Sequence, residues 1–137
     1  MTLHGGIVAC DITNVDGVDR ELFIALFRST FLPLIQQGTI VIMDNAIIHY
    51  APEIEEMIKE KNAELLFLPA YSFDLNPIEQ SFSKMKSYLV RNRAEAVANP
   101  KLAMMNALMS ISVKDTAGYF RQAGYDIIEL IPVGLYI

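Results

Sequence analysis

Three short, uninterrupted apolar runs constrain the fold of this chain more than any other feature of its sequence. They occupy residues 7–10, 40–43 and 65–68. Apolar runs of this length are typical of strands that are buried on both faces of a covered sheet. The runs therefore predict three strands of one buried sheet.

Apolar residues at helical spacing fill the segments between these runs. The first segment begins after Asp19, ends at Gly38 and is expected to bend at Pro33, and the second begins at Pro52. The expected buried stripes are Leu22, Phe23, Leu26, Phe27 and Leu34 in the first helix, and Ile54, Met57 and Ile58 in the second.

The third run is followed by a turn-rich loop and then by a helix that begins at Pro77. Two more helices are expected over about residues 100–111 and 114–122, before a mixed apolar tail. The expected core positions of these helices are Ile78, Phe82, Met85 and Leu89, and then Met104, Met105 and Met109. Because strands and helices alternate, the sequence predicts an α/β fold with a largely parallel sheet covered by helices on both faces.

The composition is that of a folded domain. The chain has 137 residues, of which 53% are hydrophobic and 20% charged, so we expect a single globular unit. No apolar run reaches the length of a membrane span, and the N-terminus lacks the order of a secretory signal, so we expect a protein that is not secreted. Cys10 is the single cysteine and is expected to be a core thiol, while His4 carries no functional signal.

The net charge of -5 argues against a protein that holds nucleic acid mainly by broad electrostatic attraction. It does not exclude nucleic-acid chemistry, because a site that collects carboxylates for metals is acidic until the metals bind. The basic residues that cluster in one stretch are Lys84, Lys86, Arg91 and Arg93. That stretch is either a phosphate contact or, more commonly, a solvated helix face.

Asp44 and Glu79 are the candidate metal-binding carboxylates. Asp44 follows directly on the second apolar run, at the carboxyl end where open α/β sheets place ligands. Taken alone, Asp44 more often begins a turn with Asn45. Glu79 alone is explained as the partner of Asn76 in a helix start that resembles a capping box.

Considered together, Asp44 and Glu79 favour a metal site over the separate turn and capping roles. A loop after one central strand and a helix after its neighbour can bring Asp44 and Glu79 to the same end of the sheet. Hard cations such as Mg²⁺ prefer a few carboxylate oxygens together with water and phosphate. Two such cations can activate water and stabilise the leaving oxygen in phosphodiester cleavage.

Two sequence blocks carry a resemblance to a known family. The first is VIMDNAIIH over residues 41–49, and the second is FLPAYSFDLNPIE over residues 67–79. They resemble the two signature blocks of DDE transposases of the Tc1/mariner and IS630 superfamily. In this resemblance Asp44 and Glu79 match the second and third catalytic acids. The 34 residues between positions 44 and 79 are the spacing of the DD34E subgroup.

The resemblance implies a ribonuclease-H-like fold, an incomplete mixed sheet flanked by helices on both faces. It extends from about Gly5 to residues 118–125, so we expect a partial catalytic domain over residues 1–125 and a tail over 126–137. The family's first catalytic Asp and its helix-turn-helix region lie upstream of the matching part. The positions that depart mildly from the family's pattern are Ala70, Phe73, Ser81 and Phe82.

No acid near the start of this chain is expected to replace that first Asp. Asp11 lies on or after the strand that resembles the family's third strand. Asp16 and Asp19 fall in a turn and a helix start, where Asp is ordinarily a cap. The resemblance therefore implies a catalytic set that lacks its first member.

Six further residues are candidates for supporting roles. Those near the acids are Asn45, His49 and Asn76, and those that could contact DNA are Tyr71, Lys84 and Lys86. A histidine at a helix entrance is more often only hydrogen-bonded locally, and Asn76 is first a helix cap. Tyr71 could stack on a base, but packing against the sheet is the more common role. The lysines could touch phosphates or be solvated.

The leading hypothesis is a transposase catalytic domain that cleaves DNA at element ends and joins the freed 3′ hydroxyl to target DNA, using two Mg²⁺ or Mn²⁺ ions. The resemblance then implies DNA as partner, and the nucleus as location in a eukaryote or the cytoplasm otherwise. The alternative is a catalytically inactive remnant, or a co-opted domain that binds DNA or protein. A third hypothesis is a ribonuclease-H-like nuclease that acts outside transposition.

An incomplete sheet also has a physical consequence. Loss of the upstream strands exposes a sheet edge, which invites pairing with another chain. We therefore expect self-association, including a homodimer, or marginal solubility.

Overall fold

The structure is a computed structural model that describes Met1, residues 17–125 and residues 135–136. These residues divide into two compact units. The sheet unit contains residues 17–72 and 135–136, and the helical unit contains Met1 and residues 73–125. This division does not decide the predicted boundary at residue 125, which stays a prediction.

Several predictions from the sequence lie outside the described residues. They concern the strand at 7–10 and the residues His4, Cys10, Asp11 and Asp16. Within the described part of the chain, no helix is long and apolar enough to cross a membrane.

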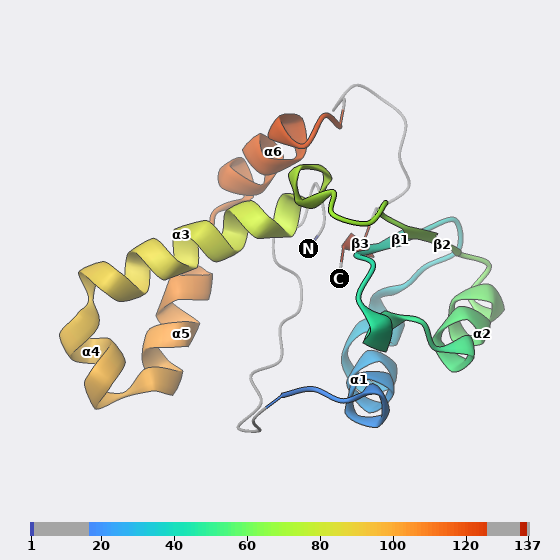
Figure 1. Cartoon of the computed structure of the whole chain (residues 1–137), viewed down its shortest axis with the longest axis horizontal. Helices are drawn as coiled ribbons and strands as arrows, with labels where there is room; N and C mark the ends of the chain where they lie inside the picture. The colour runs from blue at the N-terminus through green and yellow to red at the C-terminus, as the bar shows by residue number, and fades with distance from the viewer. Residues whose placement is uncertain (2–16, 126–134, 137) are drawn as a thin grey trace. The chain divides into compact units, whose positions relative to one another are not determined.

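The sheet unit is built on three parallel strands in the order β2-β1-β3 (Figure 1). The central strand, β1 (Ile40–Met43), pairs with β2 (Glu64–Phe67) and with β3 (Leu135–Tyr136). In the register, Ile40 lies opposite Glu64 and Val41 lies opposite Leu135. Parallel strands with helices between them confirm the predicted α/β class, and β2 begins one residue earlier than predicted.

The core of the sheet unit lies on one face of β1. Val41 and Met43 are fully buried, and they share a face because side chains alternate along a strand. The helices α1 (Arg20–Leu26) and α2 (Pro52–Glu60) both contribute to the same cluster of buried residues. Its members are Phe23, Phe27, Ile35, Val41, Met43, Ala51, Ile54, Met57, Ile58 and Ala63. Helices on the opposite face of the sheet stay a prediction.

Burial on both faces, expected of every strand, is wrong for β2. Leu66 is 50% exposed, and Phe67 is also exposed. The strand packs against α2 through the face that carries Leu65, which is partly buried against the core. An apolar run alone does not distinguish a strand covered on one side from a strand covered on two.

The first helix is shorter than its apolar pattern suggests. α1 spans Arg20–Leu26, and Asp19 caps it by accepting a hydrogen bond from the Leu22 N–H at 2.8 Å. The chain then widens into the π-helix η1 (Phe27–Phe31) and tightens into the 3-10 helix η2 (Leu32–Leu34). The helical segment ends at Leu34, before the predicted end at Gly38, and Pro33 lies in its last, 3-10 turn. A proline ring clashes with the carbonyl one turn earlier in an α-helix, which is consistent with this change of helix type.

The second helix agrees with its prediction. α2 spans Pro52–Glu60 and buries Ile54, Met57 and Ile58. Proline at its start and acids in its first turn suit the helix N-terminus. The helix packs against β2 and contributes its apolar stripe to the buried cluster of the sheet unit. It ends before Asn62, whose carbonyl accepts a hydrogen bond from the Gly38 N–H.

The helical unit consists of the short η4 (Phe73–Leu75) and four α-helices. The α-helices are α3 (Pro77–Arg91), α4 (Arg93–Ala98), α5 (Pro100–Met109) and α6 (Val113–Gln122). Both α5 and α6 pack against the long α3 (Figure 1). The sequence did not predict α4, which forms where α3 ends at Asn92.

The buried positions of this unit differ from the prediction. In α3 the buried residues are Pro77 and Ser81, whereas Phe82 is 47% exposed. In α5 they are Ala103 and Ala107. The core positions predicted for Met105 and Met109 are wrong, since both are exposed, and Met104 is half-buried. α5 packs against α3 and α4, and the residues that it buries are the small Ala103 and Ala107 rather than the longer methionines.

Candidate metal centre

β1 delivers Asp44 to the carboxyl end of the sheet. The backbone ladder continues one step past the strand, where the Leu68 N–H donates to the Met43 carbonyl at 2.9 Å. Asp44 is the next residue and is half-buried. Its Oδ1 accepts a hydrogen bond from the Ala46 N–H at 3.0 Å. This contact confirms that Asp44 begins a turn, as a side-chain oxygen bonded two residues ahead commonly does.

His49 is the closest polar neighbour of that carboxylate. It ends the 3-10 helix η3 (Ile47–His49), and its Nδ1 lies 2.7 Å from Asp44 Oδ1 and 3.2 Å from the Asp44 carbonyl oxygen. The imidazole is buried and packs on the ring of Phe23, with 4.7 Å between centroids. His49 is thus hydrogen-bonded locally, as the common interpretation holds, but its partner is the candidate metal ligand itself. Asn45 is exposed.

Glu79 occupies the first turn of α3. Asn76 caps this helix by accepting a hydrogen bond from the Ile78 N–H at 3.2 Å, as predicted. The reciprocal half of the capping box is absent, because the Asn76 N–H donates to the Phe73 carbonyl at 3.1 Å. Among the described residues, no side chain or backbone group pairs with the Glu79 carboxylate. Helix capping therefore does not account for Glu79, although a negative charge there suits the helix N-terminus.

The candidate DNA contacts differ from one another. Tyr71 is 91% exposed and has a φ of 61°, so the expected packing against the sheet is wrong. Lys84 on α3 makes an ion pair with Asp115 on α6 at 2.7 Å, which ties the two helices together. Lys86 is exposed. Of the two lysines, Lys86 keeps the freer ammonium group.

The Lys84 ammonium and the Ser112 hydroxyl act on the same carboxyl group. Their hydrogen bonds hold the pKa of Asp115 well below its ordinary value. Ser112 and Asp115 form a capping box at the start of α6. Asp115 is therefore fully engaged in holding the helical unit together, and it is not a free carboxylate.

The candidate residues fall into two sets. Those of the sheet unit are Asp44, Asn45, His49 and Tyr71, and those of the helical unit are Asn76, Glu79, Lys84 and Lys86. Each set is described within its own unit, and the meeting of Asp44 with Glu79 stays a prediction. The described residues contain no group of three or more His, Cys, Asp or Glu side chains that could hold a metal.

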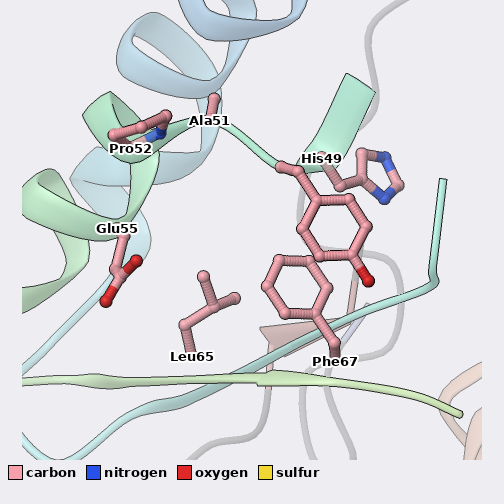
Figure 2. A pocket seen from close by; sticks show the side chains of 7 residues that line it. His49, Ala51, Pro52, Glu55, Leu65 and Phe67 are labelled. Carbon is pink, nitrogen blue, oxygen red and sulfur yellow. The ribbon is translucent and has the colours of Figure 1, made fainter. Parts of the chain in front are cut away.

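A stacked aromatic pair lies beside Asp44 and His49 and was not predicted from the sequence. The rings of Tyr50 and Phe67 lie 4.5 Å apart with 17° between their planes. They line a cavity of about 180 Å³ together with Glu55 of α2 and Leu65 of β2 (Figure 2). The signal available in the sequence was position, since Phe67 ends its strand and Tyr50 directly follows His49.

The chain matches the DDE superfamily endonuclease family over residues 1–99 and belongs to that family. The matched part contains residues 41–49 and 67–79, and hence both candidate acids. No curated protein and no solved structure matches the chain. The resemblance found in the sequence is thereby confirmed at the level of the DDE superfamily, which is a family of nucleases.

Proposed function

We propose that this chain is the catalytic part of a DDE transposase of the Tc1/mariner and IS630 type, in its DD34E subgroup, with a ribonuclease-H-like fold. It would cleave DNA strands at element ends and join them to target DNA. One observation carries the proposal: the family match spans both Asp44 and Glu79 at the spacing of that subgroup. DNA is then its substrate, in the nucleus of a eukaryotic host or otherwise in the cytoplasm.

Asp44 and Glu79 would hold the Mg²⁺ or Mn²⁺ that this chemistry uses. Their local structure fits that task. The hydrogen bonds that reach the Asp44 carboxylate from described residues all go to Oδ1, and the Glu79 carboxylate has no described partner. Hard cations prefer such carboxylate oxygens. A divalent ion held by Asp44 and Glu79 would supply an activated water and charge stabilisation for the leaving oxygen.

The protein's own part is to hold these oxygens and the DNA. β1 and the turn after it fix Asp44, while the Asn76 cap and Pro77 fix the helix turn that carries Glu79. Lys86 would contact a phosphate, because its ammonium group is exposed and Lys84 is engaged by Asp115. The exposed Tyr71 ring would stack on a base.

The test is Mn²⁺-dependent nicking of a supercoiled plasmid by this chain completed with the family's first catalytic Asp, and this completed protein is the wild type of the comparison. We expect nicking by the wild type and its loss, by at least about 100-fold, in Asp44→Asn and in Glu79→Gln, since each removes a ligand charge. Glu53→Gln is the matched control, because Glu53 is an exposed acid in the first turn of α2. It should nick as the wild type does.

Two results would contradict the proposal. Undiminished nicking by Asp44→Asn would remove Asp44 from the site. Absence of nicking by a folded wild type, at every Mn²⁺ concentration, would instead favour the non-catalytic alternative.

A further inference from the structure

One oxygen of the Asp44 carboxylate is used twice. Oδ1 accepts a hydrogen bond from the Ala46 N–H at 3.0 Å and a second from His49 Nδ1 at 2.7 Å. The first donor belongs to the turn that Asp44 begins. The second donor belongs to the His49 ring, five residues after Asp44. Two hydrogen bonds to one oxygen restrict the rotation of the whole carboxylate group.

The short contact defines which nitrogen of His49 carries a proton. An ionised carboxylate can only accept hydrogen bonds, and so can a backbone carbonyl. Nδ1 faces both Asp44 Oδ1 and the Asp44 carbonyl oxygen, so Nδ1 must be the donor. The tautomer that fits this geometry donates from Nδ1 toward Asp44.

The ring itself is held in place by the core. His49 is 8% exposed, and its ring packs on Phe23, which belongs to the buried cluster of the sheet unit. η3 brings the ring back over the turn that Asp44 begins. A buried ring with a polar partner is costly to rotate, because a new orientation would leave its nitrogen without a hydrogen bond. Because the core holds the His49 ring in place, the ring in turn holds the partly exposed Asp44 carboxylate in place.

The other oxygen of Asp44 is left open. The Asp44 side chain is 44% exposed, and no described residue donates to Oδ2. Metal-ligating carboxylates are commonly oriented by hydrogen bonds from neighbouring groups, which fix the ligand for the metal. The arrangement at Asp44 has that form.

We propose that His49 is a positioning residue that fixes the Asp44 carboxylate so that it binds a divalent cation through Oδ2 alone. The inference rests on the proposed function, in which Asp44 is a metal ligand. It adds the residue that orients this ligand and the oxygen that binds. His49 itself does not bind the cation through Nδ1, because that nitrogen donates a hydrogen bond to Asp44.

The experiment compares two substitutions of His49 by Mn²⁺ titration of the full chain. His49→Leu keeps apolar bulk against Phe23 and removes the donor. His49→Asn retains a donor, because the amide nitrogen of Asn can occupy the place of Nδ1. We expect His49→Leu to weaken Mn²⁺ binding by about 10–100-fold, as loss of an orienting group does, and His49→Asn to stay within a few-fold of the wild type.

Thermal unfolding without metal provides the second measurement. A purely structural role predicts that the loss of thermal stability in the two variants parallels any loss of Mn²⁺ affinity. The positioning role predicts that affinity follows the donor instead, so that His49→Asn is rescued even if its melting temperature falls with that of His49→Leu. Affinity that follows the melting temperature in both variants would overturn the inference.

Asp44→Asn separates this inference from the proposed function. If Asp44→Asn abolishes Mn²⁺ binding and His49→Leu leaves it unchanged, the positioning role is wrong and the metal site stands. If Asp44→Asn binds Mn²⁺ as tightly as the wild type, the proposed function fails and the inference fails with it.

Discussion

Tyr71 and Asn62 are the non-glycine residues of the described chain that have a left-handed backbone, with φ values of 61° and 52°. This conformation costs a residue with a side chain about 1 kcal/mol or more. Asn tolerates it best, whereas Tyr has no such preference. Tyr71 also buries almost nothing, so its side chain does not repay that cost through packing.

Replacement of Tyr71 by glycine should therefore leave stability unchanged or raise it slightly, because glycine adopts this backbone freely. The same change should weaken DNA binding by about 5-fold or more if the ring stacks on a base, since such stacking contributes about 1–3 kcal/mol. Chemical unfolding and a DNA-binding titration measure the two effects.

Asn62→Gly is the matched control for Tyr71→Gly. It makes the same backbone change at the end of α2, outside the sequence block that contains Tyr71. It should not alter DNA affinity. Equal DNA binding by the wild type and Tyr71→Gly would exclude the stacking role.

In the candidate site, the sequence predicted those hydrogen bonds that join residues close together in the chain. The turn at Asp44 and the cap at Asn76 follow from their positions after a strand and before a helix. The His49 contact was only a general expectation, because η3 forms between the two residues and sequence spacing does not define the path of the chain. The Glu79 side chain accepts no hydrogen bond from the Asn76 N–H, because that N–H donates to the Phe73 carbonyl, a contact that the sequence does not reveal.

At the scale of elements, the ion pair between α3 and α6 makes stability depend on pH. The hydrogen bonds from Lys84 and Ser112 lower the pKa of Asp115 from its ordinary value of 3.8. A carboxyl group with a lowered pKa in the folded state stabilises that state above its unfolded pKa. This contribution is lost as the pH falls below about 4 toward the folded pKa.

Asp115→Asn should cost about 1 kcal/mol at neutral pH, from a helix cap and a partly exposed ion pair. The difference from the wild type should narrow as the pH is lowered from about 4, because the wild type then loses the charge that the variant lacks. Urea unfolding followed by circular dichroism over that range is the measurement. A difference that stays constant with pH would show that the charge of Asp115 does not stabilise the fold.

Two lysines of α3 provide the control for this prediction. Lys84→Met removes the partner of Asp115 and should reproduce part of its loss. Lys86→Met removes an exposed lysine from the same helix, and it should change stability by less than about 0.5 kcal/mol.

The sequence predicted the sheet unit better than the helical unit, for a physical reason. In α2, apolar residues recur on one side, so the pattern identifies the buried face. α5 is apolar on nearly all sides, and its periodicity therefore could not show that Ala103 and Ala107, rather than Met105 and Met109, are buried. In α3 the small polar Ser81 is buried, and its hydroxyl donates to the Met1 sulfur at 3.4 Å, a contact that helical periodicity does not reveal.

At the scale of the whole molecule, β2 is an edge strand of the described sheet and carries exposed apolar side chains. An edge of this kind is a template for pairing with another chain. The expected self-association should therefore involve β2. Leu66→Lys should reduce it, because a charge on an edge strand opposes pairing, and light scattering across a concentration series measures the change.

Val97→Lys is the matched control for Leu66→Lys. It introduces the same charge at an exposed apolar residue, 75% accessible, on α4 rather than on the sheet. It should leave self-association unchanged. A wild-type chain that stays monomeric at all concentrations would contradict the expectation itself.

The pairing of β3 with β1 sets the order in which this molecule can fold. Val41 pairs with Leu135, and most of the other described residues lie between them in the chain. Closing so long a loop costs entropy that must be met before the contact forms, which makes such contacts slow. The contacts among the helices α3 to α6 join residues that are closer in sequence than Val41 and Leu135, so these helices can pack first. During synthesis β1 can therefore pair with β3 only after the ribosome has released residues 135–136. A chaperone that shields apolar strands would act in that interval.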